Sequence, residues 1–266
     1  LAAESAAGIV VPARAQLLRG IMAELERISH HVNDVGAICN DASVVVLQAR
    51  CTLLREDFLN TADACFGHRL MMDVITPGGV SRDMAAEGPQ RLLALLDRCS
   101  AGFEEVVRLY DSIPSLLDRT VTTGIVKREY AMTFAAGGHV GRASGRGFDA
   151  RSAFPYAPYR ASDVEPAVRE EGDVNARVWV RILEVRRSIV LIRQFLARLE
   201  AGPVSTPFTP RAGEGAALVE AFRGDLFLAL RLNSDGVVES FHARDASVFQ
   251  WPLLETAIEG NIVADF

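Results

Sequence analysis

The sequence lacks any run of about 18 uncharged apolar residues, the length that a membrane-spanning helix requires. Its longest apolar stretches, such as residues 189–192, are interrupted by arginine within a few positions. The first residues contain neither a basic region nor an initiator methionine, so they do not resemble a signal peptide. We therefore predict no membrane span, and we expect this chain to be cut from a longer protein.

The sequence also lacks an excess of basic residues. It has 28 Lys and Arg against 34 Asp and Glu, a net charge of −6. A nucleic-acid-binding domain usually has a basic footprint, so nucleic acid is not an expected partner. Hydrophobic residues make up 49% of the 266 residues. This composition is typical of a globular domain with a substantial core.

Paired metal-binding motifs are absent. No C-x-x-C pair and no H-x-x-x-H spacing occurs, so neither a thiolate metal site nor a histidine zinc site is predicted. Single cysteines in apolar helical patterns usually act as small buried hydrophobes, and a reducing compartment suits them. The isolated cysteines are Cys39, Cys51, Cys65 and Cys99.

Apolar residues with a spacing of three to four predict long helices in the first two thirds of the chain. The first is expected from Pro12 to about Gly36. The second is expected over residues 41–66, with Asn40 or Asp41 as its cap. Further helices are predicted over residues 89–110 and 173–199.

The period then changes. Short strands are predicted over residues 218–222, 226–232 and 237–242, with Asp235-Gly236 as a hairpin turn. Residues 135–166 have no clear period and are expected to form an irregular loop.

The fold class is therefore mainly α with a small antiparallel sheet near the C-terminus. One domain, 1–266, is expected, with a helical core at about 12–200, a sheet at about 216–243 and a closing helix at about 248–260.

Glu24, Arg27 and His31 are spaced so that they share one side of the first predicted helix, beside its apolar face. An acid, a base and an imidazole in this position indicate a buried group that handles protons. A solvated or salt-bridged helix edge is the alternative.

Arg223 lies at the junction of two predicted strands, next to Gly224. A guanidinium at a strand end can project into a site. It could equally pair with Asp225 or Glu220 in a surface turn.

Several segments, taken in order, resemble one family. These are RGIMAELERISHHVNDVGAICND at 19–41, PGGV with Asp83 at 77–83, and RASG with a following D, R and PY..Y at 142–159. The others are the helix at 171–188 and the RD…W…GNI ending at 244–262. The chain is similar to the large subunit of energy-converting [NiFe] hydrogenases, of the formate hydrogenlyase and hydrogenase-4 type. It is also similar to their relative, the quinone-site subunit of Complex I, the NADH:quinone oxidoreductase.

This resemblance implies functional roles for four residues. Arg223 corresponds to an arginine over the nickel–iron site of the hydrogenases. His31 and Asp41 match positions on the proton or quinone side of the cavity, and Glu24 completes the candidate catalytic set. Two positions depart from the hydrogenase pattern, because Phe222 and Ala246 stand where that family has proline.

The resemblance further implies an oxidoreductase subunit that moves electrons between H₂ or a quinone and an iron–sulfur partner, with coupled proton transfer. No cofactor is expected within this chain. A nickel–iron centre would belong to the full-length protein, and Fe–S clusters to the partner subunit. Expected partners are that small subunit and membrane-arm subunits, which would hold the protein on the cytoplasmic face of the inner membrane. The alternative is a metal-free paralogue that acts as an assembly or docking scaffold.

Overall fold

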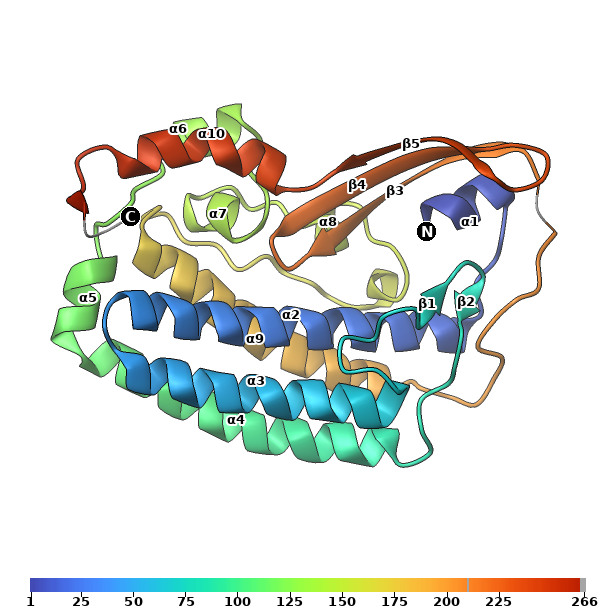
Figure 1. Cartoon of the computed structure of the whole chain (residues 1–266), viewed down its shortest axis with the longest axis horizontal. Helices are drawn as coiled ribbons and strands as arrows, with labels where there is room; N and C mark the ends of the chain where they lie inside the picture. Colours follow the sequence, from blue (N-terminus) through green and yellow to red (C-terminus); the bar gives the residue numbers. More distant parts are fainter. Residues whose placement is uncertain (210, 264–266) are drawn as a thin grey trace.

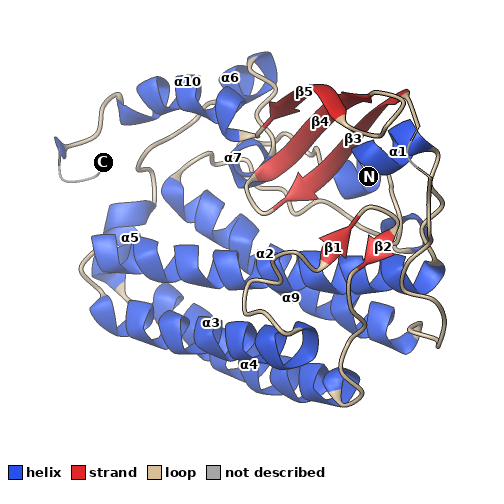
Figure 2. Ribbon diagram, turned by 45° about the vertical axis from the view of Figure 1, so that its right-hand side comes forward, coloured by secondary structure: helices blue, strands red, loops and turns tan. Residues whose placement is uncertain are grey.

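A bundle of long helices forms the larger layer of the molecule. The computed structural model describes residues 1–209 and 211–263. Figures 1 and 2 show the long helices lying side by side, with helix α2 packed against both α3 and α9. Their inward faces carry most of the buried apolar side chains. The bundle helices are α2 (Ala13–Asp41), α3 (Val45–Phe66), α4 (Gly88–Ser112) and α9 (Val174–Ala197).

Helix α2 is longer than the sequence predicts. The expected end at Gly36 is wrong, because the helix continues to Asp41. A Cβ atom on Gly36 would lie 2.7 Å from the Cβ of Cys51, so glycine is required here by the close approach of α3. The predicted cap of the second helix is also wrong. Asn40 and Asp41 end α2, and α3 begins after Val44.

A three-stranded antiparallel sheet lies across the bundle (Figure 1), as predicted. Its strands β3 (Gly213–Ala221), β4 (Gly224–Leu232) and β5 (Val238–Arg244) follow in sequence order. The turn between β4 and β5 contains Asp235 and Gly236, where it was expected. A short helix that the sequence did not predict, α1 (Ala2–Ala7), packs against β3 and β4.

Short elements connect the two layers. The segment predicted as an irregular loop contains α7 (Gly138–Ala143), α8 (Ala150–Ala153) and the 3₁₀ turn η1 (Tyr159–Ala161). The closing helix α10 (Ser247–Ile258) lies above α7 in Figure 1. The remaining elements are β1 (Ile75–Thr76), β2 (Gly79–Val80), α5 (Pro114–Thr120) and α6 (Arg128–Thr133).

The backbone of α7 meets the turn between β3 and β4 directly. A Cβ atom on Gly138 would lie 1.9 Å from the carbonyl oxygen of Arg223, and the φ of Gly138 is +61°. Only glycine suits both conditions. The glycine-rich segment around His139 therefore serves close packing of backbone on backbone.

The mainly helical fold class with a small C-terminal sheet is confirmed. Among the described residues, no helix is both long and apolar enough to cross a membrane.

Replacing Gly36 by valine tests the α2–α3 contact. The added side chain must displace Cys51, so we expect the free energy of unfolding to fall by about 1–3 kcal/mol. The matched control is Gly202→Ala, because a Cβ there would be 4.0 Å from its nearest neighbour, Arg14. Chemical denaturation measures both variants. Equal stability of the two would contradict the packing described.

Candidate active site

Glu24 is the centre of a buried hydrogen-bond network between the bundle and the sheet. Its side chain is 0% exposed. Its carboxylate accepts hydrogen bonds from Arg27 Nε at 3.2 Å and from Arg151 Nη1 at 3.1 Å. The hydroxyls of Ser188 and Tyr159 donate to it at 2.5 and 2.6 Å. The solvated alternative for this helix edge is therefore wrong, and the edge is buried and ion-paired.

A second cluster of buried charges surrounds Arg142 of α7. Its guanidinium forms an ion pair with Glu184 of α9 and another with Glu220 of β3, the latter at 2.8 Å. Asp149, the N-cap of α8, pairs with Arg151 at 2.7 Å. Because Arg151 also contacts Glu24, the two clusters form one network that joins α2, α7, α8, α9 and β3.

The network keeps most of its acids ionised. Burial alone would raise the pKa of Glu24, but Arg27 and Arg151 outweigh it, so the pKa is lowered. Glu184 follows the same pattern against Arg142 and His31, and its pKa lies well below its ordinary value. For Asp149, pairing with Arg151 overcomes burial and lowers the pKa to about 2.

Glu220 differs from these acids in the direction of its shift. Burial, with a smaller contribution from the neighbouring charge of Asp149, raises its pKa despite Arg142. Glu220 is therefore the acid of the network that accepts a proton most readily.

His31 is fully buried and oriented by Glu184. Its Nε2 atom lies 2.6 Å from a carboxylate oxygen of Glu184. A carboxylate only accepts hydrogen bonds, so Nε2 carries the proton and Nδ1 presents a lone pair. Nδ1 has no hydrogen-bond partner among the described residues. Burial lowers the pKa of His31 despite Glu184, which keeps the imidazole neutral. The result is a base whose ring is held by a carboxylate.

His139 has the opposite arrangement. Its Nε2 atom lies 2.9 Å from Nη2 of Arg181, which can only donate, so the proton of a neutral His139 lies on Nδ1. This Nδ1 is also buried and unpartnered within the described part of the chain. Burial, Arg181 and nearby His31 hold the pKa of His139 well below its ordinary value. One buried histidine thus offers a lone pair, and the other offers an N–H.

The turn that carries Arg223 is held by α2. Arg27 donates to the carbonyl oxygens of Glu220 and Ala221 at 2.6 and 2.8 Å. His30 stacks on Phe222 with ring centroids 3.8 Å apart. Adjacent histidines on a helix point in different directions, so His30 packs on the turn while His31 enters the network.

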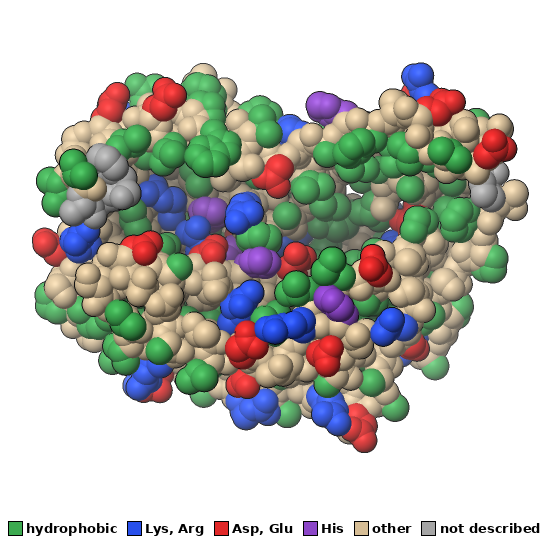
Figure 3. All heavy atoms as spheres, in the orientation of Figure 1, with side chains coloured by type: hydrophobic (Ala, Val, Ile, Leu, Met, Phe, Trp, Pro, Cys, Tyr) green, Lys and Arg blue, Asp and Glu red, His purple; other side chains and the backbone are tan. Residues whose placement is uncertain are grey.

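Arg223 itself is exposed, and its guanidinium lies 4.9 Å from the centroid of the Phe222 ring. The ion pairs considered from sequence are not formed, because Asp225 pairs with Arg244 and Glu220 pairs with Arg142. Instead, Arg223 lines a pocket of about 500 Å³ beneath α10. Figure 3 shows the surface hollowed between this upper layer and α2, with basic and histidine side chains gathered in the hollow.

The structure groups three of the four sequence-predicted residues around the α2–β3 junction. Glu24 and His31 lie in the network, and Arg223 lies on the turn fixed by Arg27. Asp41 does not join them. It is exposed at the last position of α2, ten residues beyond His31, which is about 15 Å along a helix axis.

The described residues do not fit a nickel–iron centre. No group of three or more His, Cys, Asp or Glu side chains among them could hold a metal ion. The cysteines are buried, and burial raises the pKa of Cys39, Cys51 and Cys99 to about 12. Such thiols stay protonated and are poor metal ligands.

Sequence reasoning missed most of the network. Charged residues within the motifs at 142–159 and 171–188 were matched to the family without being assigned to a site. The signal available was a set of charges in segments that otherwise pack as core. The missed residues are Arg142, Asp149, Arg151, Tyr159, Glu184, Ser188 and Glu220.

Comparisons with known proteins agree with this architecture. Residues 41–209 match the model of the family described as "Respiratory-chain NADH dehydrogenase, 49 Kd subunit". The carbon monoxide-induced hydrogenase of Rhodospirillum rubrum is 34% identical over 100% of this chain and 74% of its own length. A subunit of the NADH-quinone oxidoreductase of Dehalococcoides mccartyi is 32% identical over the same shares.

A solved structure has the same fold. It is the membrane-bound sulfane sulfur reductase, an archaeal respiratory membrane complex. One of its chains matches with a TM-score of 0.92 and 25% identity, over 99% of this chain and 74% of that one. These proteins define a class, the oxidoreductase subunits of respiratory and hydrogen-metabolising complexes. Within it, this chain belongs to the family of the respiratory-chain NADH dehydrogenase 49 Kd subunit, whose relatives include both quinone oxidoreductase subunits and hydrogenases.

Replacing Glu184 by glutamine tests the network. The substitution removes the charge that pairs with Arg142 and orients His31, so we expect a loss of about 3–5 kcal/mol in unfolding free energy. The control is Asp97→Asn, which breaks the exposed pair with Arg193 and should cost at most about 1 kcal/mol. Losses of similar size in the two variants would contradict a buried network.

The pH dependence of stability tests His139. Its folded pKa is depressed below the ordinary value of 6.5, so below that pH the unfolded chain binds a proton that the folded chain does not. Unfolding free energy should therefore fall as pH falls below about 6.5, by about 1.4 kcal/mol per pH unit for each such histidine.

We expect His139→Gln to make this slope shallower by one histidine's share, whereas replacement of exposed His242 by glutamine leaves it unchanged. Denaturation curves between about pH 5 and 7 measure the slopes. An unaltered slope in His139→Gln would show that this imidazole titrates normally.

Proposed function

We propose that this subunit forms one wall of a redox cavity in a multisubunit complex. At this cavity, H₂ or a quinone exchanges electrons with an iron–sulfur partner subunit, and protons are transferred in the same reaction. The buried base His31 is the observation that carries the proposal. Both conversions require proton donors or acceptors next to the reacting centre, and an unpartnered imidazole lone pair meets this requirement.

Two further residues support the assignment. Glu24, ion-paired on α2 one turn from Arg27, supplies a fixed negative charge within the same network. Arg223 supplies an exposed cation on the turn that Arg27 holds, where it can stabilise developing negative charge on a substrate. Asp41 lies apart from both, so we assign it to the outer end of a proton path.

The relatives support a peripheral membrane location. The sulfane sulfur reductase is named as a respiratory membrane complex, and this chain has its fold. We infer that the present subunit likewise binds an iron–sulfur small subunit and membrane-arm subunits. They would hold it at the cytoplasmic face of the inner membrane.

The test is turnover of the assembled complex containing His31→Gln. Glutamine keeps a polar side chain but cannot act as a base, so electron transfer from H₂ or to quinone should fall about 100-fold or more. The control is His242→Gln on the exposed strand β5, which should keep full activity. Assembly and iron content are measured in parallel, so that a loss of turnover is read only in intact complex.

Normal turnover in assembled His31→Gln complex would contradict the proposal. It would favour the scaffold alternative, in which the network serves only to hold the two layers together.

A further inference from the structure

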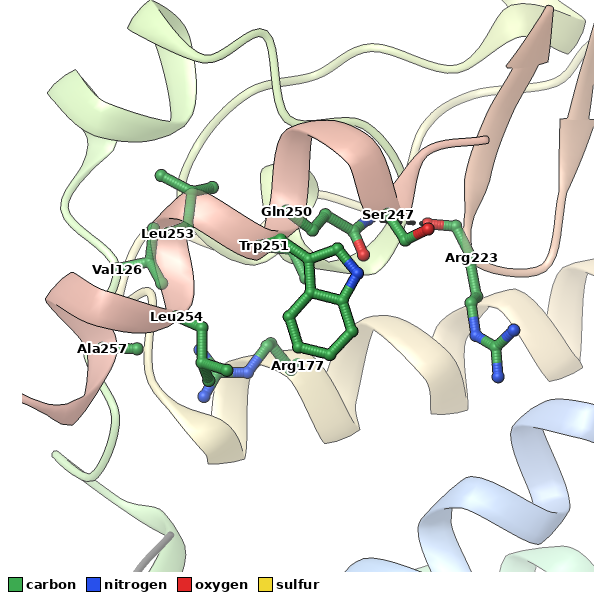
Figure 4. A pocket seen from close by; sticks show the side chains of 10 residues that line it. Val126, Arg177, Arg223, Ser247, Gln250, Trp251, Leu253, Leu254 and Ala257 are labelled. Carbon is green, nitrogen blue, oxygen red and sulfur yellow. Dashed lines mark hydrogen bonds between the residues drawn. The ribbon is translucent and has the colours of Figure 1, made fainter. Parts of the chain in front are cut away.

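The pocket beneath α10 has an apolar wall and a cationic edge. Its apolar side chains come from α10, α7 and the segment before α6, and they leave Trp251 67% exposed. Figure 4 shows Arg177 of α9 and Arg223 of the β3–β4 turn on either side of Trp251. The apolar lining residues are Val126, Val140, Trp251, Leu253, Leu254 and Ala257.

Arg177 lacks a carboxylate partner among the described residues. Its guanidinium donates only to the carbonyl oxygens of Gly124 and Gly172, at 2.9 and 2.7 Å. The nearby acid, Asp173, caps α9 through the backbone N–H of Ala176 and also accepts from the backbone N–H of Thr122. Burial and the neighbouring Arg181 lower the pKa of Arg177 to about 10. A cation in this environment gains from an anion placed beside it.

Arg223 is likewise not neutralised within the described residues, since none of their ion pairs includes it. The nearest acid that senses its charge, Asp245, accepts from the backbone and hydroxyl of Ser247 instead. The remaining acids around the turn, Glu220 and Asp225, belong to other arginines.

We propose that this pocket binds a small amphipathic organic anion. Its carboxylate or phosphate group would lie between Arg177 and Arg223, and its apolar body would lie against Trp251 and Leu254. A volume of about 500 Å³ suits a ligand of this size. The inference deepens the proposed function in one respect only, because Arg223 is shared between the pocket and the redox cavity.

Helix α10 gives the pocket a fixed shape. Gln250 donates to the carbonyl oxygens of Gly137 and Arg223, which ties α10 to α7 and to the turn (Figure 4). At the other end, the side chain of Asn261 accepts from the backbone N–H of Gly124. The apolar wall and the cationic edge are therefore held relative to each other before any ligand binds, which lowers the entropic cost of binding.

Calorimetric titration of the purified protein with octanoate tests the proposal. Octanol, which lacks the charge, and inorganic phosphate, which lacks the apolar body, are the comparison probes. We expect octanoate to bind at least about ten-fold more tightly than either. Arg223→Gln and Trp251→Ala should each weaken octanoate by about ten-fold, whereas Arg231→Gln, on exposed β4 surface, should not.

Arg177→Gln gives the same expectation where thermal unfolding shows it folded, and the exposed Trp251 and Arg223 variants decide the matter otherwise. Equal binding of octanoate and octanol, or octanoate binding unchanged by both exposed variants, would overturn the proposal. This binding measurement involves no electron transfer. Loss of octanoate binding with normal dependence of turnover on His31 therefore contradicts the anion site alone, and the reverse result contradicts the redox role alone.

Discussion

The burial of Glu24 is the constraint on which the rest of the structure depends. An ionised carboxylate away from water is strongly unfavourable unless charges and hydrogen bonds compensate it. Here Arg27, Arg151, Ser188 and Tyr159 all reach it, from α2, α8, α9 and the η1 turn. Each of these elements must be correctly placed for the carboxylate to be satisfied. Buried charges of this kind need not add much net stability, but they penalise wrong arrangements of bundle and sheet.

The same network determines what the surface presents. Arg27 uses its remaining donors on β3 carbonyls, and His30 packs on Phe222, so α2 sets the position of the turn that carries Arg223. Glu184 joins the network to His31 through one oxygen and to Arg142 through the other. A base, an N–H donor on His139 and an exposed cation are thus held by connected contacts, although they come from separate parts of the chain. This connection between scaffold and site explains why charged groups persist in a core that could have been apolar.

Much of this fold could be predicted from the sequence, because helix periodicity and hairpin turns are local signals. The long helices and the three strands follow from residue spacing, and ordered motifs identified the family. The end of α2 could not be predicted, since Gly36 looks like a helix stop and its role is contact with Cys51 on α3. Glu24 and His31 were found because they share one helix face. Their partners Arg151 and Glu184 lie more than 100 residues away, and no spacing rule pairs residues at that separation. Asp41 matched the family by position, yet helix geometry sets it apart from the network.

The protonation state of His31 tests the account most directly. Nitrogen NMR of the protein labelled in histidine, with His31→Gln to assign the signal, reports which ring nitrogen carries the proton. The structure predicts a neutral ring at neutral pH, with hydrogen on Nε2 facing Glu184 and a bare Nδ1. A doubly protonated ring, or hydrogen on Nδ1, would contradict the claim that the network holds His31 as a base.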